Sequence, residues 1–376
     1  MTAMISQLFL QHYWWIIVSI LASLLVFLMF VQGGQSMIYS LPKNDLQKTM
    51  IINSLGRKWE FTFTTLVTFG GAFFASFPLF YATSFGGAYW VWIAILFSFI
   101  IQAVAYEFRS KPDNVFGNRT FDLFLFLNGS LGPFLIGVAV ATFFTGAMYS
   151  LDQMNQVRWA TPWYGLEALL NLRNLALGLA VLFLVRINGL MYLINTIDDE
   201  TLIRKSVRGV MINAIPFLIF FLFFVISLLI SSGFAADRST GLITVEKFKY
   251  LHNFIEMPFV LILFLAGVSG VLYGIGITLL KKSHSGIWFS GSGTVLAVFS
   301  LFLVAGFNGT SFYPSLYNLQ SSLTIRNASS SLFTLKTMMY VSFIIPLVLV
   351  YIWYAWKAIN NTKITAQEMS AEEHKY

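Results

Sequence analysis

Nine runs of about 20 mostly apolar residues, separated by short polar segments, constrain this chain more than any other feature of its sequence. A helix of about 20 such residues crosses the hydrocarbon core of a bilayer and satisfies its own backbone hydrogen bonds there. We therefore predict an all-α polytopic membrane helix bundle that forms a single integral membrane domain over residues 1–376. The predicted spans are residues 12–31, 60–82, 88–106, 121–145, 169–194, 210–231, 256–280, 287–307 and 337–356.

Composition excludes the other broad classes of protein. Apolar residues make up 57% of the chain and charged residues only 10%, whereas a soluble domain has about 25% charged residues. The chain therefore lacks the polar side chains that would cover a soluble enzyme. Its lack of cysteine excludes disulfides, thiolate nucleophiles and iron–sulfur clusters. No basic run precedes the first apolar segment, so we expect a retained helix rather than a signal peptide.

The distribution of Lys and Arg predicts the orientation. An odd number of spans places the termini on opposite sides of the membrane. One set of connecting segments holds fifteen Lys and Arg residues and the other set seven; the basic set comprises segments 32–59, 107–120, 195–209 and 281–286 and the tail after residue 356. Because basic loops stay in the cytoplasm, we predict an outer N-terminus and an inner C-terminus. This bias explains the net charge of +7, so no nucleic-acid partner is expected.

Some tryptophans and glycines are expected to serve the bundle itself. Tryptophans near span ends are typical of lipid-facing interfacial anchors; these are Trp14, Trp15, Trp353 and Trp356. Glycines at helical spacing are typical of close helix packing; these are Gly70, Gly71, Gly267, Gly270, Gly274 and the adjacent Gly276.

The histidines are poorly placed for cofactor chemistry. All four lie at span ends, in loops or in the tail, namely His12, His252, His284 and His374. No pair of them is expected to face each other inside the membrane, so we predict that this chain alone binds no haem. The sequence also has no clustered metal ligands and no nucleotide-binding loop. We therefore assign no catalytic, cofactor-binding or metal-binding residue to the chain.

Polar residues gather at the predicted cytoplasmic ends of the first three spans. Such groups are costly in lipid and are functional candidates by default. The group consists of Gln32, Gln35, Trp59, Glu60, Gln102, Glu107, Arg109 and Lys111. A carboxylate near lipid has its pKa raised by desolvation and lowered by a nearby cation, and such a group can transfer protons. Spacing leaves two interpretations open: a proton path, or a solvated rim with ordinary salt bridges.

Three other charges near span ends have simpler interpretations. Arg186, inside the fifth span, either extends its side chain toward the interface or pairs with a carboxylate of another chain. Asp122 and Glu256 stand at the starts of two spans, where a negative charge interacts favourably with the helix dipole.

Several motifs, in order along nearly the whole chain, resemble subunit II of the cytochrome bd quinol oxidase family. Ile52-Asn53-Ser54 with Lys58-Trp59-Glu60 is similar to the family's Ile-Asn-Ser … Trp-Asp stretch, and Glu107–Lys111 is similar to its Asp-Tyr/Phe-Arg-Ser-Lys. The Gly-Gly-Ala-rich run at 70–85 and the loop at 322–335 also resemble family segments.

The resemblance implies a bacterial cytoplasmic-membrane heterodimer in the aerobic respiratory chain. In the family, a haem-bearing subunit I holds the b and d haems and oxidises quinol on the outer side. The complex reduces oxygen to water with protons taken from the cytoplasm. Subunit II supports subunit I and supplies part of a proton path, and in some members it binds a structural quinone. The presence of a small third subunit stays open.

The family's proton path is carried over one residue at a time. The resemblance places family aspartates at Gln32, Gln35, Glu60 and Glu107, and a family arginine at Gln102. It implies that Trp59 and Glu60 form a polar gate, that Glu107 is a second carboxyl with Arg109 as its charge partner, and that Gln32 and Gln35 organise water. If the family arginine at position 102 pairs with one of the aspartates at positions 32 and 35, replacing both partners by glutamine avoids leaving one buried charge unpaired.

Two other functions stay open on the sequence. A secondary transporter favours inverted repeats and helices broken at the midplane. Pro78, Pro133, Pro216 and Pro346 could break helices, but no paired halves are evident. A purely structural scaffold subunit is the third possibility.

Overall fold

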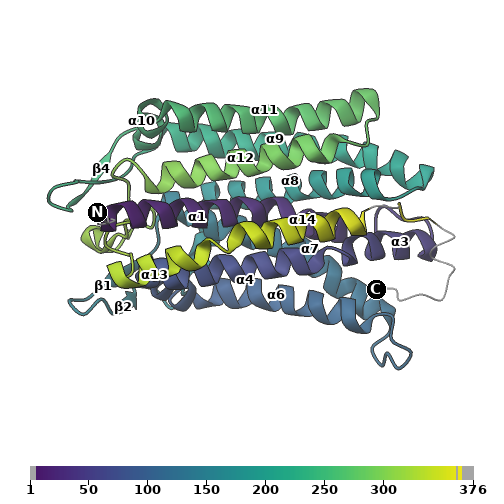
Figure 1. Cartoon of the computed structure of the whole chain (residues 1–376), viewed down its shortest axis with the longest axis horizontal. Helices are drawn as coiled ribbons and strands as arrows, with labels where there is room; N and C mark the ends of the chain where they lie inside the picture. The colour runs from purple at the N-terminus through teal and green to yellow at the C-terminus, as the bar shows by residue number, and fades with distance from the viewer. Residues whose placement is uncertain (1–5, 361–362, 366–376) are drawn as a thin grey trace.

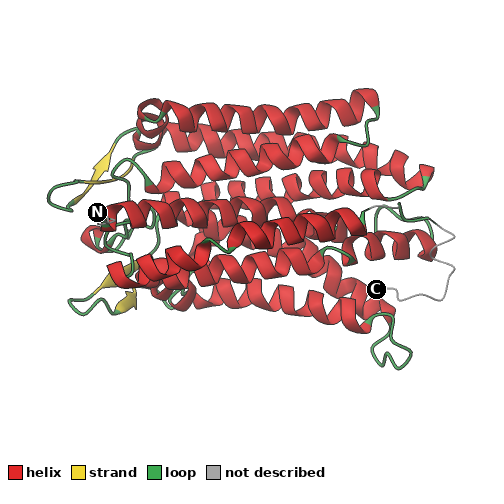
Figure 2. Ribbon diagram, in the orientation of Figure 1, coloured by secondary structure: helices red, strands yellow, loops and turns green. Residues whose placement is uncertain are grey.

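The computed structural model describes residues 6–360 and 363–365 as a bundle of long, roughly parallel and antiparallel helices (Figures 1 and 2). The long helices are α1 (Gln7–Leu28), α4 (Trp59–Ser76), α6 (Tyr89–Phe108), α7 (Asn118–Thr145), α8 (Leu172–Thr196), α9 (Glu200–Ile230), α11 (Pro258–Lys281), α12 (Gly286–Gly306), α13 (Leu332–Ser342) and α14 (Ile345–Ile359). The all-α membrane bundle predicted from the sequence is confirmed.

Short elements connect these helices and distinguish the two ends of the bundle. They are α2 (Phe30–Gln35), α3 (Asp45–Gly56), α5 (Pro78–Phe80), η1 (Tyr81–Gly86), η2 (Leu166–Leu170), α10 (Lys249–Glu256) and η3 (Leu319–Ser321), with strands β1 (Tyr149–Leu151), β2 (Val157–Trp159), β3 (Gly233–Ala236) and β4 (Ile243–Glu246). The strands form two antiparallel hairpins, β1–β2 and β3–β4. We call the end with the hairpins the hairpin end, and the end with α3 the basic end (Figure 1).

Eight helical segments in the described chain are long and apolar enough to span a membrane, and a bent pair makes nine if it is counted as one span. The bent pair is Asp45–Ser76 with Pro78–Gly86, and the chain bends by 116° between them. The span predicted at 60–82 therefore breaks at Phe77, because the ring of Pro78 disfavours helical backbone in the residue before it. The start of α1 and the end of α14 lie at opposite ends of the bundle (Figure 1).

Two predicted span boundaries were wrong in a way that matters for the site. α9 begins at Glu200, ten residues before the predicted start, because Asp199 caps it by accepting a hydrogen bond from Leu202 N at 2.8 Å. The first span does not end at residue 31. Helix α2 continues it after a break at Met29, so that Gln32 and Gln35 are helical and buried.

Glycines let several helices approach closely. A Cβ on Gly33 would lie 1.8 Å from the Val185 carbonyl oxygen of α8, so α2 packs directly on α8. Gly267, Gly270 and Gly274 of α11 contact α12 closely, as predicted; a Cβ on Gly267 would lie 2.5 Å from Ala297 N. The packing prediction was wrong for Gly71 and Gly276, since a Cβ on either would meet nothing within 4 Å.

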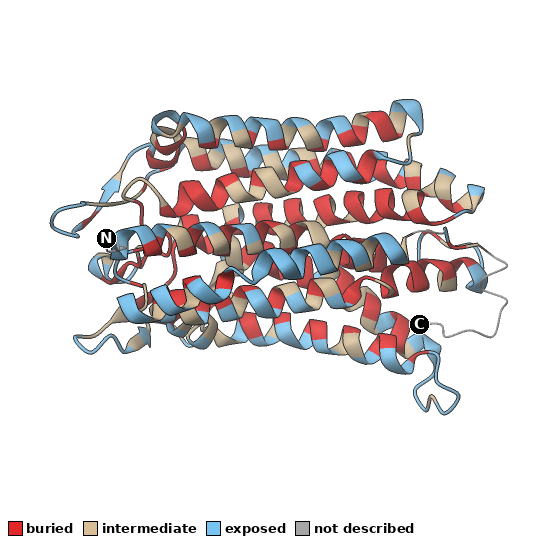
Figure 3. Cartoon of the chain, in the orientation of Figure 1, coloured by how far each residue is buried: buried red, intermediate tan, exposed pale blue. Residues whose placement is uncertain are grey.

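The tryptophans of α1 are core residues. Trp14 and Trp15 are buried, and their Nε1 groups donate to the carbonyl oxygens of Leu335 and Phe302, each at 3.0 Å. The prediction that these two are lipid-facing anchors was wrong, because the backbone carbonyls of α12 and α13 take the role of interfacial water. On α14 no residue is buried and Trp353 is exposed, so this helix lies on the outside of the bundle (Figure 3).

Candidate functional site

A polar stripe runs along the buried face of α6 at the basic end. Ser98, Gln102, Tyr106 and Arg109 follow each other at intervals of four, four and three residues, which places them on one side of the helix. All four are buried. Lipid-exposed helices rarely carry such a stripe, so this face of α6 is built to meet other polar groups.

Helix α2 presents two buried amides to that stripe. Nε2 of Gln32 donates to Oε1 of Gln102 at 3.2 Å, and Nε2 of Gln35 donates to the Tyr106 hydroxyl at 2.8 Å. Helix α7 comes close enough to enclose them, because a Cβ on Gly129 would lie 2.9 Å from Cβ of Gln35. Farther from the basic end, Nδ2 of Asn128 lies 3.4 Å from the Ser98 hydroxyl. We call Gln32, Gln35, Ser98, Gln102, Tyr106 and Asn128 the amide column.

The amide column has more hydrogen-bonding atoms than partners. Four of its buried atoms have no hydrogen-bond partner among the described residues: Gln32 Oε1, Gln35 Oε1, Gln102 Nε2 and Asn128 Oδ1. A buried polar atom without a partner costs about 1–3 kcal/mol, and buried water commonly satisfies such atoms. The column therefore has three acceptors and one amide donor available to water molecules.

The aromatic residues beside the column are well ordered by packing. Trp59 is buried and stacks on Tyr106, with ring centroids 5.8 Å apart and planes at 14°. Its Nε1 has no hydrogen-bond partner in the described chain. Trp59 therefore adds a hydrogen-bond donor on the residue that stacks against Tyr106, whose hydroxyl accepts from Gln35.

The two predicted carboxyls do not face the column. Glu60 is exposed and continues an exposed stripe of α4 through Thr64, Val67 and Phe74. Glu107 is exposed and continues a similar stripe of α6, opposite the polar one, consisting of Phe97, Ile100 and Val104. Of the seven residues predicted as a proton path, the structure thus buries Gln32, Gln35, Trp59, Gln102 and Arg109 together and leaves Glu60 and Glu107 on the surface.

Arg109 pairs with Asp122, so the predicted pairing with Glu107 was wrong. Its Nε lies 2.8 Å from Asp122 Oδ1, and Lys48 Nζ of α3 lies 3.2 Å from the other carboxylate oxygen. Residues 107 and 109 are two apart and diverge from each other at the end of α6. The interpretation of Asp122 as a charge at a helix start was also wrong, since α7 begins at Asn118 and Asp122 is buried.

Sequence reasoning missed Asp122 and also Lys58. Lys58 is fully buried, and its Nζ lies 4.3 Å from the ring centroid of Trp356 without a hydrogen-bond partner in the part of the chain described. A cation over an indole face is stabilised by the ring quadrupole. Arg186 binds within its own chain, its Nε donating to the Ser36 hydroxyl at 2.9 Å. The signal for Asp122 was present, since Arg109 continues the polar stripe of α6 and requires a counter-ion.

The family described as cytochrome bd terminal oxidase subunit II matches residues 10–359. The chain belongs to this family. Subunit 2 of the cytochrome bd-I ubiquinol oxidase of Escherichia coli (strain K12) is 26% identical over 388 aligned residues, with 99% of each chain covered. Subunit 2 of the cytochrome bd ubiquinol oxidase of Bacillus subtilis (strain 168) is 28% identical, with 88% of this chain and 89% of that protein covered.

A solved structure supports the fold. A chain of the bd oxidase from Geobacillus thermodenitrificans superposes with a TM-score of 0.61 at 13% identity, covering 90% of this chain and 96% of the other. The chain is thus subunit II of a bd-type oxidase, an oxidoreductase complex that includes a partner subunit I. It is a multi-pass protein of a bacterial inner membrane. Family membership favours the oxidase over the transporter alternative.

Proposed function

We propose that the amide column of this subunit II conducts protons from the cytoplasm toward the oxygen-reducing partner subunit. The observation that supports this is the set of four buried column atoms without partners among the described residues. Water bound to these atoms forms a hydrogen-bonded chain along α2, α6 and α7. The Lys and Arg bias of the sequence predicts that the basic end, where the column begins, faces the cytoplasm.

Glutamines serve this path through water rather than by titration. A Gln side chain neither gains nor loses a proton near neutral pH, but its oxygen accepts and its NH₂ donates hydrogen bonds. A proton therefore moves between ordered water molecules while the amides hold those molecules in place. The uncharged amides also avoid the cost of an isolated charge in a low dielectric. Glu60 and Glu107, which are exposed at the same end of the bundle as the column, collect protons at the surface.

The exposed stripes of α4 and α6 face subunit I in this proposal. Both stripes are mostly apolar, with Thr64 the polar member of the one on α4, and they carry one carboxyl each, Glu60 and Glu107, at the basic end. Contact with subunit I would put these carboxyls at the boundary between the two subunits. Subunit I would also oxidise the quinol and hold the b and d haems, and two of the described histidines of this chain are already engaged in hydrogen bonds within it. His252 bonds Glu246 at 2.7 Å, and His284 bonds the Ile194 carbonyl at 2.7 Å.

The proposal is tested by replacing both carboxyls in the complete complex. Glu60→Gln with Glu107→Gln is expected to lower quinol-driven oxygen consumption and proton uptake by roughly tenfold, because positioned acid–base groups contribute at least that much. The matched control is Glu200→Gln, which neutralises an exposed glutamate of α9 at the same end. Full turnover with normal proton uptake in the double variant would favour the structural scaffold instead.

We propose that one cavity of this chain receives the headgroup of a structural quinone. The cavity, of about 180 Å³, lies at the hairpin end between Trp92, Trp159, Tyr313 and Glu167. Nε1 of Trp159 is buried without an acceptor in the described chain, and a quinone carbonyl is an acceptor. Trp159→Phe is expected to lower the amount of quinone that can be extracted with solvent from the purified complex. The control is Trp163→Phe, which replaces an exposed residue shortly after β2 and is expected to leave the quinone content unchanged. An unaltered quinone content in Trp159→Phe would contradict this placement.

A further inference from the structure

The hairpin end holds a second cavity with an unusual mixture of surfaces. It has a volume of about 540 Å³. One wall is the first part of α1, with Leu8, His12 and Ile16 at intervals of four residues. The other wall comes from the β3–β4 hairpin and the loop before α13, which contribute Arg238 and Arg326. Two arginines thus line the same cavity as a mainly apolar strip of α1, in which His12 is the polar member.

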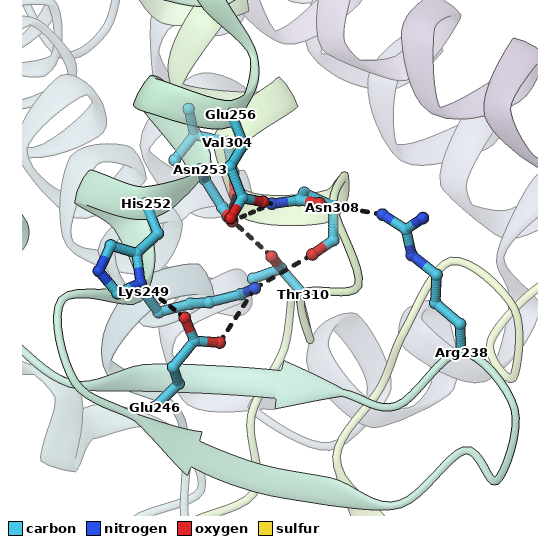
Figure 4. A network of polar contacts seen from close by, with 9 residues as sticks. All are labelled: Arg238, Glu246, Lys249, His252, Asn253, Glu256, Val304, Asn308 and Thr310. Carbon is cyan, nitrogen blue, oxygen red and sulfur yellow. Dashed lines mark hydrogen bonds and ion pairs between the residues drawn. The ribbon is translucent and has the colours of Figure 1, made fainter.

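A polar network fixes the position of one of these arginines (Figure 4). Arg238 Nη2 donates to Asn308 Oδ1 at 3.0 Å. Asn308 has a left-handed backbone with φ of 57°, which few residues adopt. Its Nδ2 donates to Asn253 Oδ1 at 3.0 Å and to a Glu256 oxygen at 2.5 Å, and its carbonyl accepts from Lys249 Nζ at 3.1 Å.

The same network is itself well anchored. Lys249 Nζ lies 3.2 Å from Glu246, and Asn253 Nδ2 donates to the Val304 carbonyl at 2.9 Å and to the Thr310 hydroxyl at 2.8 Å. The guanidinium of Arg238 is therefore held at the edge of a rigid cluster, as Figure 4 shows. A preorganised cation loses little conformational freedom when it binds an anion.

The charges that line the cavity leave donors for a ligand. Arg326 Nη1 donates to the Arg238 carbonyl at 2.6 Å, so this second guanidinium is held against the backbone of Arg238. A guanidinium has five N–H donors, and most of those on both arginines stay available. The lining carboxylate, Asp237, accepts bonds from Ser239 and Thr240 at 2.6–2.9 Å. These bonds, first from the Ser239 hydroxyl, hold the pKa of Asp237 well below its usual range, and they satisfy its Oδ1 within its own turn.

We propose that this cavity binds the headgroup of an anionic phospholipid from the leaflet at the hairpin end, with Arg238 and Arg326 on the phosphate and the acyl chains along α1. Arginine suits phosphate because its planar fork donates two parallel hydrogen bonds. Exposed Leu8, Phe9, Ile16 and Ile20 extend the apolar strip down α1, where lipid chains would lie. The two arginines match the phosphate of a phospholipid, and the apolar strip of α1 matches its acyl chains. A free anion would use only the arginines. This inference does not depend on the proton path.

The test is native mass spectrometry of the delipidated full complex with added phosphatidylglycerol. Wild type is expected to bind one phosphatidylglycerol more tightly than the rest. Arg238→Gln with Arg326→Gln is expected to weaken that binding by roughly tenfold. Both side chains are exposed, so the double variant should fold, and an unchanged melting temperature checks this. The matched control, Arg158→Gln with Lys247→Gln, removes two exposed charges from the same end outside the cavity and is expected to bind as wild type does.

Four results would overturn the proposal. The first is equal phosphatidylglycerol binding by wild type and the cavity variant, and the second is an equal loss in the control variant. The third is equally tight binding of phosphatidylcholine, or displacement by inorganic phosphate at millimolar concentration, which would indicate no selectivity for an anionic lipid. The fourth is a loss of bound quinone, rather than of phosphatidylglycerol, in the cavity variant.

Discussion

Replacing Gln102 with leucine is expected to slow oxygen reduction by the complete complex by roughly tenfold or more. Leucine has nearly the same size but removes the acceptor for Gln32 Nε2, which lies 3.2 Å away, and the Nε2 atom that has no partner in the described chain. A water chain through the amide column would lose its middle member. Proton uptake should fall with turnover, while reduction of the haems by quinol under anaerobic conditions stays fast.

Gln11→Leu is the matched control for this experiment. Gln11 is also a buried glutamine, and its Nε2 donates to the Ser329 hydroxyl at 2.7 Å and to the Arg326 carbonyl at 3.2 Å. It lies at the hairpin end, far along the bundle from the column. Both variants lose buried hydrogen bonds, so a defect caused only by weaker packing would appear in both. Equal oxygen consumption in the two variants would remove the column from the proton path.

Asp122→Asn is expected to destabilise the subunit by about 3 kcal/mol, because it leaves two cations beside a group that no longer balances them. Arg109 lies 2.8 Å and Lys48 3.2 Å from the Asp122 carboxylate. The side chains of Asp122 and Arg109 are 3% and 8% exposed, so water screens this pair little. Lys48 is 20% exposed and contributes less. The measurement is chemical or thermal unfolding of the purified complex in detergent.

A double variant separates charge imbalance from loss of packing. Asp122→Leu with Arg109→Met removes both buried charges, and it is expected to recover most of the stability, because apolar replacement of a buried ion pair is often neutral. The control is Asp152→Asn. Its partner, Arg158, is 75% exposed at 3.8 Å, so about 0.5 kcal/mol or less is expected. If Asp122→Asn unfolds at the same temperature and denaturant concentration as wild type, the ion pairs of Asp122 with Arg109 and Lys48 do not stabilise the subunit.

The amide column shows how far sequence reasoning reaches for the site. The sequence placed Gln32, Gln35, Gln102 and Trp59 at one end of the bundle, and the structure brings them together. It did not separate Gln102 from Glu107, which lie on opposite faces of α6. Five residues along a helix correspond to a rotation of about 140°, so the side chains of Gln102 and Glu107 point in different directions from the helix axis. Which of the two faces the bundle interior depends on where α2 and α7 pack.

The order and approximate position of the spans, and through the motifs the family, can be read from the sequence, because crossing a bilayer requires about 20 apolar residues each time. Which side of each helix is buried depends on how the helices pack against one another. In a soluble protein a polar outer face reveals the buried one, but lipid is as apolar as a protein core. Trp14 and Trp15 were therefore indistinguishable from lipid-facing anchors, and Asp122 from a surface charge, until helix packing placed partners around them.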